Sequence, residues 1–218
     1  MARIVFDLDG TLVDSAPDIH GIANALLERE GREPVTLEQT RDFIGNGVGV
    51  FVQKMRAARG IADTEHARLL ADFIERYDDA VHLTKPYPAV CDALETLVRS
   101  GHRLGVCTNK PIRPCRALLR HLDLERYFET LWGGDSLPVH KPDPAPLHAA
   151  FGALGAGERL YVGDSGVDAE TAGRAGVPFL LFTEGYRKCA VEEMPHTAAF
   201  SSFATLPSLV EDVLGRAA

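Results

Sequence analysis

One short acidic segment near the N-terminus, Phe6-Asp7-Leu8-Asp9-Gly10-Thr11, most constrains what this chain can fold into. It follows Arg3-Ile4-Val5-Phe6, an apolar run without alternation that is typical of a strand buried on both faces of a parallel sheet. The carboxylates of Asp7 and Asp9 therefore lie beside a buried strand, where two like charges are costly unless something neutralises them. A hard divalent cation such as Mg²⁺, which binds carboxylate and phosphate oxygens, would do so.

The overall charge narrows the class of partner. The 218-residue chain has 23 Lys and Arg against 31 Asp and Glu, a formal net charge of −8. Nucleic acids and anionic membranes require basic surface, so we expect neither as a main partner. A small anionic substrate remains compatible with this charge, because a local cationic site can outweigh the global field. No apolar stretch approaches the roughly 18 residues of a membrane span.

The cysteines and the N-terminus indicate the compartment. The four cysteines are Cys91, Cys107, Cys115 and Cys189, and none forms a C-x-x-C pair of the kind found in zinc or thioredoxin-like sites. Such a set is typical of a reducing cytosol. Charged residues interrupt the N-terminal segment, so we expect no signal peptide and a cytoplasmic protein. The sequence carries no indication of an oligomeric state.

The hydrophobic pattern divides the chain into two kinds of segment. From Asp18 to about His82 the apolar residues recur at helical spacing, and we expect helices at 18–30, 36–43, 49–58 and 64–81 with no strand. Breaks that contain proline flank this segment at 15–17 and 84–88. We therefore predict an all-helical cap domain at 15–85, inserted into a core domain formed by residues 1–14 and 86–218.

The second segment alternates strands with helices. Expected strands lie at 104–107, 130–132, 160–162 and 177–182, and expected helices lie at 89–100, 112–122, 144–154 and 167–175. Alternation of this kind indicates a parallel sheet with helices on both faces. The predicted fold is thus an α/β core with a Rossmann-like parallel sheet and an inserted helical cap.

Small polar and acidic side chains follow three of the predicted strands. Asp7 and Asp9 follow the first, Thr108 and Asn109 follow the strand at 104–107, and Asp164 follows the strand at 160–162. Open parallel sheets bind ligands at the carboxyl ends of their strands. These side chains are therefore expected to converge on one site.

Four ordered motifs resemble those of the haloacid-dehalogenase-like phosphatases. They are Asp7-Leu8-Asp9-Gly10-Thr11, Thr108-Asn109, Lys141-Pro142, and Gly163-Asp164 with Asp168, and together they span most of the chain. Each motif is weak alone, whereas the ordered set is highly specific. The surrounding sequence, including Gly45-Asn46-Gly47 and Lys141-Pro142-Asp143-Pro144, most resembles that of bacterial phosphoglycolate phosphatases. In that group a helical cap is inserted after the first strand.

The resemblance implies a role for each motif residue. Asp7 would be the nucleophile that forms an aspartyl phosphate. Asp9 would be the general acid and then the base, which requires that it hold a proton at neutral pH. Thr108 and Lys141 would hold the phosphoryl oxygens, helped by Asn109 and by backbone N–H groups near Gly10.

The resemblance also implies Mg²⁺ as the cofactor. Its ligands would be the Asp7 carboxylate, the Asp9 carbonyl oxygen and the Asp164 carboxylate, together with a phosphate oxygen and waters. Asp168 would orient a metal ligand without touching the ion itself.

Several residues also have ordinary structural interpretations. Asp164 and Asp168 could form a strand-end turn and a favourable first helical turn. Thr108 could cap a helix, and Lys141 could be a solvated surface lysine. The Gly45–Gly49 segment could be a plain connection between helices, or it could hang over the site and touch the substrate. The role of Lys110 stays open at this point.

The resemblance implies hydrolysis of a small phosphate monoester, with 2-phosphoglycolate as the first candidate. Its carboxylate would need donors from the cap, and the candidates are Gly45, Asn46, Gly47 and Arg41. A sugar-phosphate mutase or a broad-specificity phosphatase or pyrophosphatase would share every catalytic residue. The dehalogenase branch lacks the second aspartate, so Asp9 argues against it. A phosphate-binding protein without activity would need no intact acid, so that alternative is disfavoured.

Overall fold

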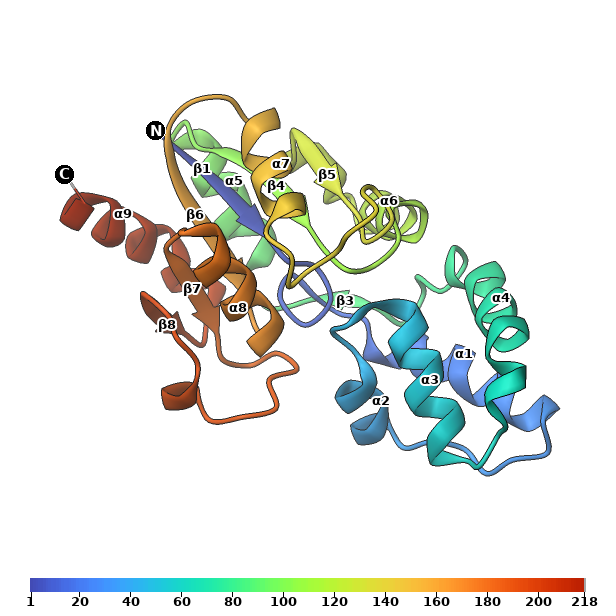
Figure 1. Cartoon of the computed structure of the whole chain (residues 1–218). Helices are drawn as coiled ribbons and strands as arrows, with labels where there is room; N and C mark the ends of the chain where they lie inside the picture. Colours follow the sequence, from blue (N-terminus) through green and yellow to red (C-terminus); the bar gives the residue numbers. More distant parts are fainter. Residues whose placement is uncertain (218) are drawn as a thin grey trace.

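A six-stranded parallel sheet forms the centre of the core domain (Figure 1). The computed structural model describes residues 1–217. The strand order is β5-β4-β1-β6-β7-β8. The bounds are β1 Ala2–Phe6, β4 Arg103–Cys107, β5 Thr130–Trp132, β6 Glu158–Gly163, β7 Phe179–Phe182 and β8 Ala198–Phe200. The parallel sheet that the strand–helix alternation predicts is therefore confirmed.

Helices cover both faces of this sheet. The side chains of α5, α6 and α9 pack in one apolar cluster on one face, and those of α7 and α8 pack in a second cluster on the other. The bounds are α5 Val90–Arg99, α6 Ile112–His121, α7 Ala145–Ala153, α8 Gly166–Ala175 and α9 Leu206–Ala217. In β1 the side chains of Ile4 and Phe6 enter the first cluster and Val5 enters the second. This division explains why β1 is apolar at successive positions.

Four helices form the cap, which lies at lower right in Figure 1 and is inserted after the first strand of the core. They are α1 Ala16–Arg29, α2 Leu37–Phe43, α3 Gly47–Ala58 and α4 His66–Tyr77. The cap has its own apolar core, in which the rings of Phe51 and Phe73 lie 5.2 Å apart. The predicted fold class, an α/β core with an inserted helical cap, is confirmed.

A short antiparallel ribbon joins the cap to the core. It consists of β2 Val13–Asp14 and β3 Lys85–Pro86 and was not predicted, because two-residue strands leave no periodicity to detect. Asp18 closes the same junction. Its carboxylate accepts hydrogen bonds from the Leu83 and Thr84 backbone N–H groups and, at 2.6 Å, from the Thr84 hydroxyl. This one carboxylate ties the start of the cap to its end.

Other differences from the expected elements are local. Helix α3 begins at Gly47 rather than 49, so only Gly45 and Asn46 of the expected glycine loop lie outside a helix. Helix α4 ends at Tyr77 rather than 81. Strand β8 and helix α9 are additional to the predicted elements. Strand β8 has three residues, which is too few for a periodic pattern. The 3₁₀ turns at Asp63–Glu65, Glu125–Tyr127, Val191–Glu193 and Phe203–Thr205 are likewise additional. Across residues 1–217, the helices are all too short or too polar to cross a bilayer.

Replacement of Asp18 by Ala is expected to destabilise the protein. The change leaves the backbone N–H groups of Leu83 and Thr84 without their acceptor at a buried junction, which typically costs about 1–3 kcal/mol. Urea denaturation followed by circular dichroism would measure the loss. Glu28→Ala is the matched control, since Glu28 is an exposed carboxylate on the same helix. An equal effect of the two changes would contradict this role of Asp18.

Candidate active site

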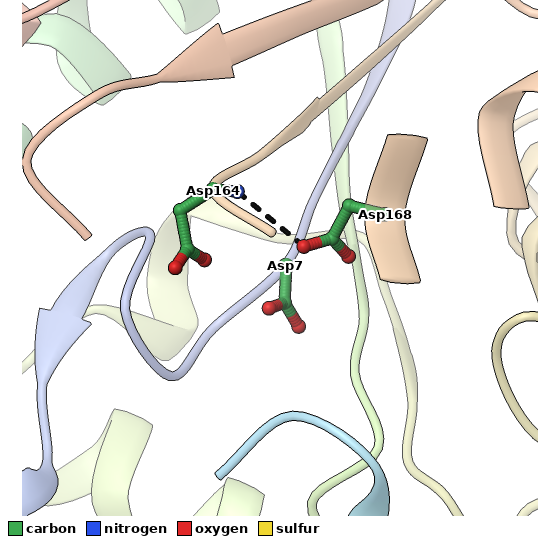
Figure 2. A group of neighbouring side chains, drawn as sticks. All are labelled: Asp7, Asp164 and Asp168. Carbon is green, nitrogen blue, oxygen red and sulfur yellow. Dashed lines mark hydrogen bonds between the residues drawn. The ribbon is translucent and has the colours of Figure 1, made fainter. Parts of the chain in front are cut away.

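The strand register brings three of the motif residues to one edge of the sheet. Phe6 of β1 pairs with Val106 of β4 and with Val162 of β6. Asp7, Thr108 and Asp164 follow these strands, so they emerge at the same edge. Figure 2 shows that the carboxylates of Asp7, Asp164 and Asp168 face a common space. The convergence expected from the strand ends is therefore present in the fold.

Lys141 supplies a buried positive charge beside these carboxylates. Its Nζ lies 2.8 Å from Asp7 Oδ1 and 2.7 Å from Asp168 Oδ1. It also donates to the Tyr161 hydroxyl at 2.9 Å. Burial alone would lower the pKa of Lys141, but Asp168 and Asp7 outweigh it and raise the pKa above its ordinary value. Lys141 is therefore an ion-paired ammonium in the core and not a solvated surface lysine.

Asp168 lies in the first turn of α8, and both of its carboxylate oxygens accept hydrogen bonds within the protein. Ser165 and Asp168 form a reciprocal capping box at the start of this helix. Asp168 Oδ1 accepts from Lys141 and from the Tyr161 hydroxyl, while Oδ2 accepts from the Ser165 hydroxyl and the Asp164 N–H. Burial raises the pKa of Asp168, but Lys141 and the other donors outweigh this effect and lower it overall. Asp168 therefore holds Lys141 and the Asp164 loop in place.

Asp164 is a buried carboxylate without a cationic partner among the described residues. Its Oδ1 accepts from the Thr11 hydroxyl at 2.6 Å, and its Oδ2 accepts from the Tyr186 N–H at 2.6 Å. Burial raises the pKa of Asp164 well above its ordinary value, and the charges of Asp168 and Asp7 raise it further. The chain packs closely around it, since a Cβ on Gly10 would lie 2.5 Å from Asp164 Oδ2. Gly10 also has a φ of +90°, so glycine is needed there on both grounds.

The residues at this edge fit a hard cation. Oxygen atoms of Asp7, Asp164 and Asp168 lie within 4.8 Å of one another, and all three residues are buried. Burial raises the pKa of Asp7 to about 7 even though Lys141 opposes the shift, and Asp168 and Asp9 add to it. Lys141 is shared between Asp7 and Asp168 and does not pair with Asp164, so a divalent cation would relieve the remaining negative charge of Asp7 and Asp164. The donors are all oxygens, which suits Mg²⁺, Ca²⁺ or Mn²⁺ better than a soft metal.

Asp9 projects towards the cap. Its Oδ1 accepts from the Ser15 hydroxyl at 2.6 Å and lies 3.3 Å from Lys110 Nζ. The Lys110 ammonium also lies 4.0 Å from the ring centroid of Tyr77, at the end of α4. Burial would lower the pKa of Lys110, but Asp9 and Tyr77 outweigh it and raise the pKa. Lys110 therefore links Asp9 to the cap.

The cap covers this edge of the sheet through the Gly45–Gly47 segment. Asp7, Asp9, Thr108 and Asn109 line a cavity together with Gly45 and Gly47. Asn109 bridges the two domains, because its Nδ2 donates to the Gly45 carbonyl at 3.0 Å and to the Lys141 carbonyl at 2.9 Å. Its Oδ1 accepts from the Lys141 N–H at 2.9 Å. The glycine segment thus lies over the site instead of forming a distant helix connection.

Two other cap candidates have different positions. Asn46 lines a second cavity, of about 370 Å³, which also contacts Asp7, Asp9 and Asp164. Arg41 lines neither of these cavities; its guanidinium donates to Asp14 Oδ2 at 3.0 Å, in the ribbon between cap and core. The structure therefore does not bring Arg41 together with the other candidates.

Sequence reasoning missed two side chains that hold the site, Tyr161 and Tyr186, and left the role of a third, Lys110, open. Tyr161 looks like an ordinary core residue in an apolar strand, yet its hydroxyl contacts both Lys141 and Asp168. Tyr186 lies in the loop after β7, where no pattern marks it; its hydroxyl donates to Asp14 and accepts from the Ala16 N–H. Lys110 directly follows the Thr108-Asn109 motif, and this adjacency was the one signal available for it.

Comparison with known proteins places this geometry in a family. The model of the haloacid dehalogenase-like hydrolases matches residues 4–182. A phosphoglycolate phosphatase of Cereibacter sphaeroides is 49% identical over 217 residues, covering 98% of this chain and 100% of the relative. The Rhodobacter capsulatus phosphoglycolate phosphatase is 42% identical, with 95% and 96% covered. A Haemophilus somnus crystal structure described as a predicted phosphoglycolate phosphatase has a TM-score of 0.88 at 30% identity, with 95% and 97% covered.

The chain belongs to the haloacid dehalogenase-like hydrolases, because the family model and full-length relatives agree. The two relatives from Cereibacter sphaeroides and Rhodobacter capsulatus are both named phosphoglycolate phosphatases. Phosphatases of this family typically use a metal ion, and the cluster of Asp7, Asp164 and Asp168 offers a site for one.

The metal-free protein is expected to lose stability as the pH rises from about 4 to about 7. A carboxyl group whose pKa is higher in the folded state binds its proton more tightly when folded, so the free energy of unfolding falls across this interval. For Asp7 the pKa is about 7 against an unperturbed 3.8. Urea denaturation in a chelator at several pH values would measure the fall.

Asp7→Asn is the matched variant for this measurement. It removes the titrating group, so at pH 7.5 its metal-free form should be more stable than the wild type, by up to about 4 kcal/mol for a shift of roughly three pH units. Near pH 4 the two proteins should be alike. Identical pH profiles would show that Asp7 does not titrate in this range.

Proposed function

We propose that this protein hydrolyses 2-phosphoglycolate to glycolate and phosphate. The observation that carries this proposal is the 49% identity to the Cereibacter sphaeroides phosphoglycolate phosphatase over the full length of that relative. The geometry supports it, because Asp7 lies against Lys141 at the edge of the sheet where Thr108 and Asp164 also emerge. The second cavity, of about 370 Å³, is of a size that suits a small phosphate ester.

Mg²⁺ is the cofactor that we propose for this reaction. The Asp7 and Asp164 carboxylates and the Asp9 carbonyl oxygen would hold it, and Asp168 would orient the Asp164 loop without touching the ion. The ion would supply positive charge to the phosphoryl oxygens and offset the repulsion between them and the carboxylates. The oxygen-only donor set and the raised pKa values of Asp7 and Asp164 support this assignment.

The reaction would proceed in two displacements. In the first, a carboxylate oxygen of Asp7 attacks phosphorus, the bond to the leaving oxygen breaks, and Asp9 donates a proton to that oxygen. In the second, Asp9 accepts a proton from water, and the water oxygen attacks phosphorus while the bond between phosphorus and Asp7 breaks, which releases phosphate and restores the Asp7 carboxylate. Asp9 Oδ2 has no hydrogen-bond partner among residues 1–217, while Oδ1 is held by Ser15, so one oxygen is available for proton transfer.

Lys141 and Thr108 would stabilise the charge that develops on the phosphoryl group. Lys141 is held by Asp168 and Tyr161, so its ammonium needs little reorganisation during the reaction. The backbone N–H groups near Gly10 would complete this set, whereas the two side-chain N–H groups of Asn109 are already bonded to the Gly45 and Lys141 carbonyls. Asn109 would instead hold the segment that follows β4 against Gly45 of the cap.

The cap would close over the bound substrate. We propose that it comprises residues 15–85 and moves about the β2–β3 ribbon, because both connections to the core pass through that ribbon. Gly45, Asn46 and Gly47 would then exclude water from the phosphoryl group. We also propose a cytoplasmic location, which all four free cysteines support.

A substrate panel tests the proposed function. We expect Mg²⁺-dependent phosphate release with kcat/KM for 2-phosphoglycolate at least about tenfold above the values for a hexose phosphate, pyrophosphate and p-nitrophenyl phosphate, a preference of about 1.4 kcal/mol. A flat profile would instead indicate a phosphatase of broad specificity. Absence of release from every substrate would indicate a mutase or a binding role and would overturn the proposal.

Asp7→Asn tests the covalent step. An amide is a far poorer nucleophile than a carboxylate, so kcat should fall by on the order of 10³-fold or more while the fold is retained. Acid quenching during turnover of labelled substrate should trap phosphate on the wild-type protein and none on the variant. Asp92→Asn, at an exposed carboxylate on α5, is the control and should behave as the wild type. Substantial turnover by Asp7→Asn would exclude the aspartyl phosphate.

A further inference from the structure

The substrate that we propose has a second anionic group, and the site must bind it. The two lysines already described are occupied: Lys141 pairs with Asp7 and Asp168, and Lys110 pairs with Asp9. The substrate carboxylate therefore needs another cationic group close to the phosphoryl site.

Lys188 is the cationic side chain among the described residues that line the second cavity. It lies in the loop after β7, and the acidic residues Asp7, Asp9, Asp164 and Glu170 line the same cavity. Its Nζ donates to the Ile44 carbonyl at 2.9 Å, one residue before Gly45 of the cap. Among residues 1–217 it forms no ion pair with a carboxylate, whereas Arg41 is paired with Asp14. Its ammonium thus remains available to a ligand.

A second lysine approaches Lys188 from the cap. Lys54 on α3 donates to the Asp42 carbonyl, two residues before the Ile44 carbonyl that Lys188 contacts, so both ammonium groups reach the same turn of the cap. Partial burial lowers the pKa of Lys188, and the charge of Lys54 lowers it further. Two neighbouring ammonium groups repel each other unless an anion lies between them. Their meeting at the boundary between cap and core is therefore the arrangement that an anionic ligand would stabilise.

We propose that Lys188 binds the substrate carboxylate and so selects carboxylated phosphate esters; Lys54 lines neither cavity and adds positive charge from the cap side. This inference rests on the proposed function and deepens it. Lys188 comes from the core and contacts the cap through the Ile44 carbonyl, so a carboxylate bound to Lys188 would also favour cap closure. The same contact explains how an otherwise acidic cavity can accept a substrate with two anionic groups.

The test compares two substrates that differ in the carboxylate. In ethyl phosphate a methyl group replaces the carboxylate of 2-phosphoglycolate. Lys188→Met should lower kcat/KM for 2-phosphoglycolate at least tenfold, mainly through a higher KM, and should change the value for ethyl phosphate no more than about threefold. Lys188→Arg, which keeps the charge, should recover most of the loss. Lys54→Met should raise the KM for 2-phosphoglycolate by a smaller factor.

Arg99→Met is the control, because Arg99 is an exposed cation at the end of α5 and lines neither cavity. It should leave both substrates unchanged. An equal fall for both substrates in Lys188→Met would show that Lys188 acts through its bond to Ile44 and would overturn the proposal. Unchanged kinetics with both substrates would also overturn it.

The wild-type values separate this inference from the proposed function. A strong wild-type preference for 2-phosphoglycolate that Lys188→Met retains would leave the proposed function standing and exclude Lys188. A wild type that does not prefer 2-phosphoglycolate to ethyl phosphate would overturn both.

Discussion

The buried ammonium of Lys141 is the interaction on which the rest of the site depends. It lies within 3 Å of carboxylate oxygens of both Asp7 and Asp168, in a part of the core with almost no solvent. Carboxylates packed together without this charge would repel one another and resist ionisation. Asp168, which Lys141 keeps ionised, in turn positions the loop of Asp164. One cation therefore organises two of the three carboxylates directly and the third indirectly.

The Asp164 carboxylate also connects the site to the cap. Tyr186 donates its N–H to Asp164, and its hydroxyl contacts Asp14 of the ribbon and the first residue of α1. The ring of Tyr186 packs in the apolar core of the cap. From the opposite side, Asn109 bonds to the Gly45 carbonyl. The position of the cap is therefore coupled to the same residues that surround the carboxylate cluster.

Much of the fold could be predicted because its signals are local. The apolar run of β1 followed by Asp7, and the switch from helical spacing to strand–helix alternation, both appear in short windows of sequence. Thr36 and Gln39 form a capping box where the short helix α2 was expected. The ribbon of β2 and β3 could not be predicted, since each strand has two residues and its partner lies about 70 positions away. The same holds for Tyr161, whose role depends on contacts with Lys141.

The sequence by itself determined the class of site: acidic and small polar residues at the ends of apolar strands, in an order typical of one phosphatase family. The places of the strands along the chain follow from local patterning, and the edge where those residues meet follows from a parallel sheet. The order of the strands within the sheet was decided by the tertiary structure. Only the tertiary structure decided which cations are already paired and which are free. Arg41 and Lys188 look alike as basic residues in the sequence, but Arg41 lies against Asp14, whereas Lys188 lines the cavity and has no carboxylate partner among residues 1–217. Charge pairing depends on long-range packing, and no local pattern records it.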